Sequence, residues 1–285
     1  MTMPKCAFIM TTRNGYSKGE NKGVWLRESL RSITNQDYDG EYMVVVNDDG
    51  STDDTQNLVS SMLKPDRDVS WRSDENQGIS PGFNRAAEIA IEHGAEWLFM
   101  QGDDDISEPD RLRATMKQLA IWQGLGYSPD VMVGWMSFID ADGNLRTERA
   151  GRETRPEKIR VALQKSPNSE TGLVLGAYSS KAWQELGGMN PDYKFAGDLD
   201  LTLRAMEAKF TIAGTPRVLY QYRTSATGNT FNISHLNREE HVRESEDVIE
   251  SHKRRFNPFH DMVSQGLKFA KKDKQERHNV KQVSA

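Results

Sequence analysis

The sequence is poor in cysteine and in long apolar runs, and each shortage excludes a class of protein. Cys6 is the only cysteine among 285 residues, so neither an intrachain disulfide nor a cysteine-based zinc site can form. No run approaches the roughly 18 consecutive apolar residues of a membrane span. The first residues are too few and too weakly basic for a secretory signal. These absences predict a cytoplasmic protein without a transmembrane segment.

The chain also lacks an excess of positive charge. It has 37 lysines and arginines against 42 aspartates and glutamates, a net charge of -5. This balance argues against a protein that coats nucleic acid. The mean hydropathy of -0.72 is typical of a globular protein with a polar surface. An anionic nucleotide would therefore need a local cation or helix N-termini to bind.

Short apolar runs alternate with helical spacing over the first 108 residues. Residues 6–10, 42–46 and 97–100 have the composition of buried strands, and Trp71 marks a possible short strand. The stretches between them repeat apolar residues at helical intervals. This succession predicts a largely parallel, doubly wound α/β sheet.

Beyond Pro109 the pattern changes. A helix is expected at residues 111–122, followed by a strand at 131–138 and a hairpin turn at 140–143. Residues 145–169 are charged and contain proline, which predicts a mobile loop. Further strands are expected at 172–178 and 218–222, and further helices at 180–186 and 199–208. After about residue 236 the chain is charged and helical in pattern.

Polar and acidic residues directly follow three of the predicted strands. They form the clusters 11–14 (TTRN), 48–51 (DDGS) and 103–105 (DDD). In an open parallel sheet, ligands bind beyond the carboxyl ends of the strands, so the clusters are expected to meet at one edge. Any single cluster could instead be a solvated turn. Three clusters at one edge favour a binding site.

The cluster Asp103-Asp104-Asp105 indicates a divalent cation. Adjacent carboxylates repel one another, and a cation relieves that repulsion. Mg²⁺ and Mn²⁺ favour oxygen ligands, commonly one or two carboxylates together with substrate phosphates. One aspartate could cap the helix after Pro109, but a cap does not account for all three. A cation on a diphosphate would stabilise the charge of a leaving group.

The ordered set of motifs resembles glycosyltransferase family 2, which has the GT-A fold. The resemblance covers roughly residues 7–223 and rests on AFIMTTRN, LRESLRSITNQDY, VVVNDDGSTDDT, NQGISPGFNRA, GDDDISEPDRL, LGGMNPDYKFAGDLDLTLRA and LYQYR. It implies a doubly wound, mixed, mostly parallel sheet flanked by helices. It also implies an inverting, hexosyltransferase-like enzyme that uses a nucleotide diphosphate sugar, with a UDP-sugar favoured.

The resemblance assigns site residues position by position. The expected nucleotide-binding residues are Thr11, Asn14, Asp49, Asn76, Gly78, Asn84 and Asp103. Among them, Asp49 is expected to contact the base, and Asp103 the ribose or a metal. The expected ligand of Mn²⁺ or Mg²⁺ is Asp104, with Asp105 as a possible second ligand.

Asp198 matches the position of the catalytic base in this family. Its expected task is to remove the proton of the acceptor hydroxyl as that oxygen attacks the anomeric carbon. The helical spacing that follows at 199–208 allows another interpretation, in which Asp198 is an ordinary N-cap.

The chain departs from the family at two positions. The family often has Glu-Asp at the base, whereas Gly197 precedes Asp198 here. The family also often has a histidine soon after its late Tyr-Arg, and none closely follows Arg223. A third protein ligand for the metal would have to come from elsewhere, with His235 as a candidate.

The resemblance also divides the chain. Residues 1–235 are expected to form the GT-A domain, with a nucleotide-binding half at about 1–108 and an acceptor-binding half at about 109–235. Residues 236–285 are expected to form a charged helical C-terminal extension with a frayed end.

Two other functions stay open. A sugar nucleotidyltransferase also uses paired aspartates on a metal, and Arg13 and Lys18 could serve its phosphate loop, although no G-x-G-x-x-G or Walker spacing occurs there. A non-catalytic nucleotide-sugar-binding protein of the same fold is kept open by Gly197 and Ser225.

The expected partners are a nucleotide diphosphate sugar and an acceptor with a hydroxyl group. The acceptor could be a carbohydrate, a lipid-linked sugar or a protein, and less readily a nucleic-acid base. The basic stretch 268–281 could touch an anionic membrane or polymer, although a solvated helix face or tail is its ordinary interpretation.

Overall fold

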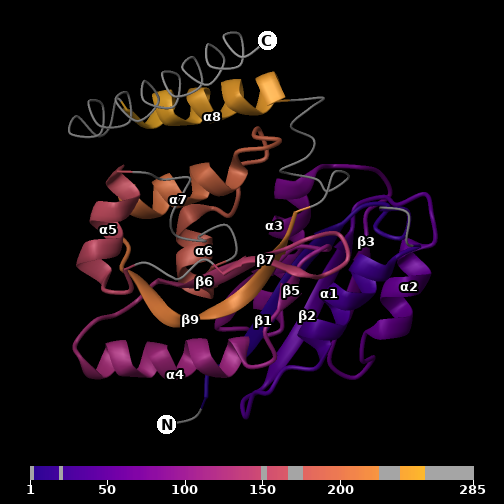
Figure 1. Cartoon of the computed structure of the whole chain (residues 1–285), viewed down its shortest axis with the longest axis horizontal. Helices are drawn as coiled ribbons and strands as arrows, with labels where there is room; N and C mark the ends of the chain where they lie inside the picture. Colours follow the sequence, from indigo (N-terminus) through magenta and orange to yellow (C-terminus); the bar gives the residue numbers. More distant parts are fainter. Residues whose placement is uncertain (1–2, 19–21, 149–152, 166–175, 225–237, 254–285) are drawn as a thin grey trace, which may run out of the picture.

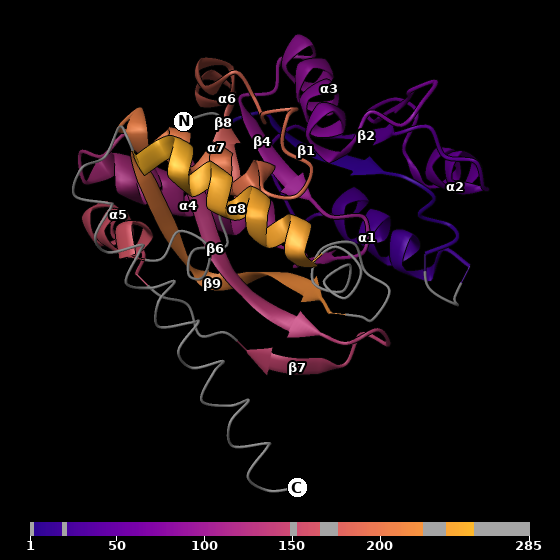
Figure 2. The same cartoon turned by 90° about the horizontal axis from the view of Figure 1, so that it is seen from above.

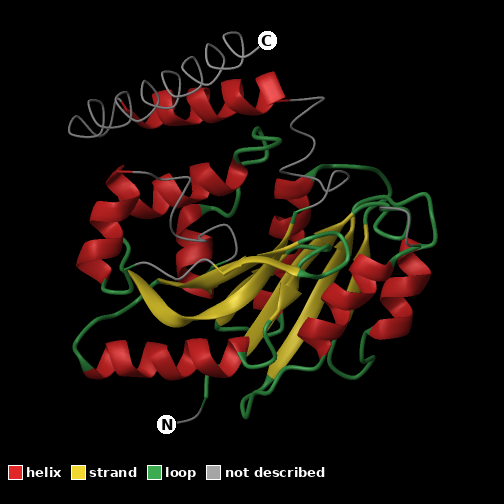
Figure 3. Ribbon diagram, in the orientation of Figure 1, coloured by secondary structure: helices red, strands yellow, loops and turns green. Residues whose placement is uncertain are grey.

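The computed structural model describes residues 3–18, 22–148, 153–165, 176–224 and 238–253. Within them, one sheet runs through the molecule and helices cover both of its faces (Figures 1 and 3). Ser225, His235 and the basic stretch 268–281 lie outside the described residues.

Four strands form the parallel part of the sheet. They are β1 (Cys6–Thr12), β2 (Tyr42–Asp48), β3 (Val69–Arg72) and β4 (Trp97–Gln101), in the spatial order β3-β2-β1-β4. The central strand β1 is apolar on both faces, with Phe8 and Met10 on one and Ala7 and Ile9 on the other. The predicted strands of the first half are confirmed, including the short one at Trp71.

The connecting helices pack on opposite faces of these strands. Helices α1 (Val24–Thr34) and α2 (Thr55–Met62) contribute to the buried cluster that contains Phe8. Helix α3 (Ile79–Glu92) contributes to the cluster that contains Ile9. Because α3 covers the face opposite to α1 and α2, the predicted doubly wound arrangement is confirmed.

The second half of the chain makes the sheet mixed. Its strands are β5 (Ile106–Ser107), β6 (Val131–Ile139), β7 (Leu145–Glu148), β8 (Ala177–Ser179) and β9 (Ile212–Arg223). The sheet continues from β4 in the order β8-β6-β9-β5, and β7 pairs with β6. β6 and β9 are parallel, whereas the β4–β8, β6–β8 and β5–β9 pairs are antiparallel. The predicted hairpin is confirmed by the antiparallel pairing of β6 with β7.

Five helices of the described residues belong to this half. They are α4 (Arg111–Gly124), α5 (Pro156–Lys165), α6 (Ser180–Leu186), α7 (Gly197–Glu207) and α8 (Arg238–Lys253). Helix α8 lies across α7, as Figure 2 shows from above. Among the residues described, no helix combines the length and the apolar character that crossing a membrane requires.

The stretch 145–169 is where the structure corrects the sequence prediction. Strand β7 and helix α5 occupy much of the segment that was expected to be a loop. Helix α5 begins at Pro156, which suits a first helical turn, and it buries Ile159 while Glu157 and Lys158 stay exposed. The high charge of the segment therefore belongs to the solvent face of an amphipathic helix.

Candidate active site

The three polar clusters meet at one edge of the sheet, as the sequence predicts. The Thr12 hydroxyl at the end of β1 donates to Asp103 Oδ2 at 2.6 Å, and Thr12 O accepts from the backbone N–H of Asp49 at 2.8 Å. The N–H of Asn14 donates to Ser51 Oγ at 2.9 Å. These bonds join the ends of β1, β2 and β4, so the clusters form one site.

Lys18 is a residue of this site that the sequence analysis connected only with an alternative function. Its ammonium group lies 2.6 Å from Asp103 Oδ1, and both side chains are largely buried. Burial alone would lower the pKa of Lys18, but the carboxylates of Asp103 and Asp104 outweigh it and hold that pKa above its ordinary value. Lys18 therefore stays charged and neutralises part of the acidic cluster.

The Asp104 carboxyl has a raised pKa. Burial and the neighbouring charge of Asp103 raise its pKa from 3.8 to about 6. The Arg223 guanidinium donates through Nε to the Asp104 carbonyl oxygen at 2.7 Å, which holds the backbone at this point. An added cation beside Asp104 would relieve the repulsion that raises its pKa.

Asp105, the possible second metal ligand, has its carboxylate bonded to β9. Its Oδ2 accepts from the Tyr220 hydroxyl at 2.7 Å, and its Oδ1 accepts from the N–H of Arg223 at 2.7 Å. The side chain is 3% exposed. Because both oxygens already accept hydrogen bonds, the structure gives Asp105 a part in joining the acidic loop to the sheet.

The donor set of Asp103 and Asp104 fits a divalent cation that also binds a substrate diphosphate. Mg²⁺ and Mn²⁺ commonly take one or two protein carboxylates and obtain the remaining oxygens from phosphates and water. No group of three His, Cys, Asp or Glu side chains able to hold a metal occurs within the described ranges. Within those ranges, the protein ligands of the cation would be these two carboxylates.

Asp49, the expected base-contacting residue, lies under the loop that leads into α3. Its two carboxylate oxygens accept the backbone N–H groups of Gln77 at 2.9 Å and Gly78 at 2.8 Å. Gly78 has a φ of 103°, a backbone conformation that favours glycine, and Asn76 beside it is exposed. The structure therefore brings Asp49, Asn76 and Gly78 together.

Of the other expected nucleotide-binding residues, Asn14 lies beside the site, whereas Thr11 and Asn84 make their hydrogen bonds elsewhere. Asn14 stays beside the site, because its Oδ1 accepts from the N–H of Thr52 at 2.8 Å. Thr11 points to the opposite face of β1 from Thr12, where its hydroxyl lies 3.4 Å from Asn47 Nδ2. Asn84 exchanges two 2.7 Å hydrogen bonds with the backbone of Met189. It therefore anchors the loop before α7.

Asp49→Ala is expected to weaken UDP binding about ten- to a hundredfold, equivalent to roughly 1–3 kcal/mol, and to lower the Tm. The Tm should fall because the N–H groups of Gln77 and Gly78 lose their acceptors. Titration calorimetry with UDP and a thermal melt measure the two effects. Unchanged UDP affinity in a variant with a lowered Tm would restrict Asp49 to shaping the loop.

Asp198 lies in the first turn of α7 and is not its N-cap. The helix begins at Gly197, with Ala196 in the capping position, so the alternative interpretation as an N-cap is wrong by two residues. The partly exposed side chain of Asp198 accepts the N–H of Leu199 through Oδ1 at 2.7 Å. Its charge is also favoured by the positive end of the helix dipole.

Gly197 is explained by close packing. A β-carbon at this position would lie 2.5 Å from Ser80 Oγ and 3.1 Å from Met189 Cε. A glutamate, which the family often has here, would therefore fit only if the side chains of Ser80 and Met189 moved. Ser80 belongs to the first turn of α3 and its hydroxyl donates to Tyr193 O at 3.3 Å. The start of α3 thus joins the loop over Asp49 to the turn before Asp198.

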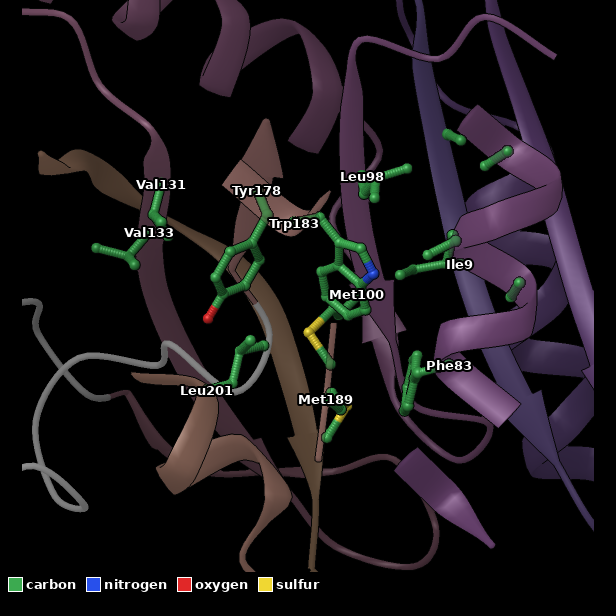
Figure 4. Close-up of a cluster of buried hydrophobic side chains, with 14 of the residues drawn as sticks. Ile9, Phe83, Leu98, Met100, Val131, Val133, Tyr178, Trp183, Met189 and Leu201 are labelled. Carbon is green, nitrogen blue, oxygen red and sulfur yellow. The ribbon is translucent and has the colours of Figure 1, made fainter. Parts of the chain in front are cut away.

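The helix that carries Asp198 is anchored in the larger of the two cores. Leu201 of α7 and Met189 lie in one buried cluster with Met100, Tyr178 and Trp183 (Figure 4). The Tyr178 and Trp183 rings meet edge to face, with centroids 5.6 Å apart. Burial, and then the charge of Asp198, raise the pKa of the Tyr178 hydroxyl. The Asp198 carboxylate is therefore close enough to the buried Tyr178 to affect the pKa of its hydroxyl.

The mixed sheet, with polar and acidic side chains at the carboxyl ends of β1, β2 and β4, has the GT-A type fold of its structural neighbours. Residues 8–122 match the model of the family described as glycosyl transferase family 2. An uncharacterized protein of Mycobacterium tuberculosis, MT1568, is 34% identical over 230 residues, which cover 75% of this chain and 67% of that protein. The chain belongs to glycosyltransferase family 2.

The names of two further similar proteins state a function or a ligand. The GalNAc(5)-diNAcBac-PP-undecaprenol beta-1,3-glucosyltransferase of Campylobacter jejuni is 27% identical over 150 residues, 53% of this chain and 43% of that protein. The crystal structure of S. aureus TarS 1-349 in complex with UDP-GlcNAc has a TM-score of 0.61 and 20% identity, over 86% of this chain and 65% of that one. The chain spans about half the length of several of the curated relatives it matches.

Proposed function

We propose that the protein transfers a sugar from a nucleotide diphosphate sugar to an acceptor hydroxyl. The observation that carries the proposal is the meeting of Asp49, Asp103 and Asp104 at the carboxyl edge of the parallel strands, joined through Thr12. Family membership supports the same class of reaction. A UDP-sugar is the favoured donor, because structural neighbours of this fold are complexes with UDP and UDP-GlcNAc.

Asp103 and Asp104 would hold Mn²⁺ or Mg²⁺ together with the donor diphosphate. When bound, the cation would stabilise the negative charge that develops on the departing diphosphate. Lys18 would supply a further positive charge at the same place, since it already contacts Asp103. Asp49 would hold the loop at Gln77 and Gly78 against the nucleoside.

Asp198 would act as the general base of an inverting transfer. The acceptor oxygen forms a bond to the anomeric carbon as the bond from that carbon to the diphosphate oxygen breaks, and the bonding electrons leave with the diphosphate. The acceptor proton passes to the Asp198 carboxylate. One displacement of this kind inverts the anomeric configuration. The acceptor would be a carbohydrate or a lipid-linked sugar, the second being suggested by the name of the C. jejuni relative.

Thermal melts and product analysis test this function against its two alternatives. UDP and its matching UDP-sugar, each with Mn²⁺, are expected to raise the Tm by mass action. A glycosyltransferase then releases UDP from the UDP-sugar. A nucleotidyltransferase would instead form or consume pyrophosphate, and a binding protein would leave the donor intact. Either result, or a panel of nucleotide sugars in which none shifts the Tm, would overturn the proposal.

A further inference from the structure

The C-terminal helix α8 reaches the turn that precedes the candidate base. Glu244 Oε1 accepts the backbone N–H of Phe195 at 2.6 Å and that of Ala196 at 2.7 Å. These two residues immediately precede Gly197 and Asp198, the first residues of α7. Ala196 occupies the capping position and has no side-chain cap of its own. A carboxylate from another helix therefore supplies the acceptor at this turn.

The far end of α8 contacts α7 a second time. His252 Nδ1 lies 2.6 Å from Glu207 Oε1, and His252 Nε2 lies 3.1 Å from Asp200 Oδ1. Burial alone would lower the pKa of His252, but its bonds to Asp200 and Glu207 outweigh burial and raise that pKa. Between the two contacts, α8 buries Val248 and Ile249. From Glu244 to His252 the helix therefore packs against α7 and the turn before it (Figures 1 and 2).

The second contact continues into an earlier part of the loop that precedes Asp198. Asp200 Oδ2 accepts from Arg204 Nε at 2.7 Å, and Arg204 Nη2 donates to Gly188 O at 2.8 Å. Gly188 precedes Met189, which bonds to Asn84 of α3. Side chains thus hold the backbone before α7 at two places, Gly188 to Met189 and Phe195 to Ala196, and the support of the second place comes from α8.

We propose that Glu244 is a positioning residue for Asp198. By accepting the N–H groups of Phe195 and Ala196, it fixes the turn from which α7 starts, and so the direction in which the Asp198 carboxylate projects. The inference rests on the proposed role of Asp198 as the base. A positioned group loses rate steeply when displaced, and a shift of about 1 Å can cost on the order of a hundredfold.

Three variants of the full chain test the role of Glu244. Glu244→Leu removes the acceptor, Glu244→Gln keeps a carbonyl oxygen in its place, and Asp247→Ala changes an exposed acidic residue of the same helix. Hydrogen exchange of the segment 193–199 should be at least tenfold faster in Glu244→Leu than in wild type. It should stay within about twofold in the other two variants, and exchange of β1 and β4 should not change in any of them.

Turnover is the second measurement. It separates the role of Glu244 in positioning from the role of Asp198 as the base. UDP release from the UDP-sugar that stabilises the protein should fall roughly 10- to 100-fold in Glu244→Leu, with UDP affinity unchanged and with rescue by Glu244→Gln. The double variant Asp198→Asn/Glu244→Leu should turn over no more slowly than Asp198→Asn alone, because the two residues act through the same step. Wild-type exchange at 193–199, or no rescue by glutamine, overturns the role of Glu244. Normal turnover of Asp198→Asn overturns the role of Asp198 whatever the exchange shows.

Discussion

Asp198→Asn is expected to lower turnover by about 10²–10⁴-fold, the usual contribution of a positioned general base. The reason is that a sugar hydroxyl is a poor nucleophile until its proton has an acceptor, and an amide cannot accept it. Asparagine keeps the size of the side chain and an oxygen that can accept the N–H of Leu199, now bonded at 2.7 Å. The Tm and the UDP affinity should therefore match wild type. UDP release, calorimetry and a thermal melt measure the three quantities.

A control aspartate lies six residues earlier in the same region. Asp192 is exposed, and Asp192→Asn is expected to leave turnover unchanged. Once an acceptor is available, the product should have the inverted anomeric configuration. Retention of configuration, or an Asp198→Asn enzyme within a few-fold of wild type, contradicts the proposed base.

Removing a negative charge at Asp104 and removing the positive charge of Lys18 are expected to change the Mn²⁺ affinity in opposite directions. Asp104→Asn removes a ligand, so Mn²⁺-dependent UDP binding should weaken by at least the roughly 10–100-fold that loss of an outer-shell partner costs. Lys18→Met removes the ammonium group that lies 2.6 Å from Asp103, so Mn²⁺ without nucleotide should bind more tightly than to wild type. Calorimetric titration of each variant with Mn²⁺, alone and with UDP, measures both effects.

Asp142→Asn, at an exposed aspartate of the β6–β7 turn, is the matched control and should leave both titrations unchanged. Unaltered metal-linked UDP affinity in Asp104→Asn would remove Asp104 from the metal site. Weaker Mn²⁺ binding by Lys18→Met would show that Lys18 supports the carboxylates and does not compete for them.

The raised pKa of Asp104 predicts that both the stability of the protein and its Mn²⁺ affinity depend on pH. The pKa of Asp104 is raised from 3.8 to about 6, so the folded protein holds a proton in this range that the unfolded chain has released. The contribution of Asp104 to stability therefore falls as the pH rises from about 4 to 6. Mn²⁺ needs the unprotonated carboxylate, so its affinity should fall as the pH drops below about 6. Asp104→Asn should lose both dependences.

The parallel half of the fold could be predicted because its signals are local. Apolar runs such as 42–46 predict buried strands, and helical spacing between them predicts the crossovers. The rule that ligands bind beyond the carboxyl ends of such strands then places Asp49 and Asp103 at one edge. The same local signals were misleading at 145–169, where charged residues on the solvent face concealed the buried positions of α5, such as Ile159.

The partners of individual side chains could not be predicted in the same way. A strand places Thr11 and Thr12 on opposite faces, but the sequence does not say which of them faces Asp103. Asn84 lies in a motif that indicates nucleotide binding, and the structure bonds it to Met189. The start of α7 was misplaced by two residues, and with it the capping position, because Ala196 has no side chain that marks a cap.

The family, the doubly wound sheet and the edge at which the acidic residues gather could all be predicted from the sequence alone. The order of the motifs indicates the family. The local spacing of apolar residues indicates the strands and helices, and this spacing does not depend on long-range contacts. The side-chain contact that each carboxylate makes follows from the tertiary structure alone. Lys18 reaches Asp103 across 85 residues, Tyr220 reaches Asp105 across 115, and Glu244 reaches Ala196 across 48. Such pairings depend on how packed elements bring distant side chains within about 3 Å, a condition that no local pattern encodes.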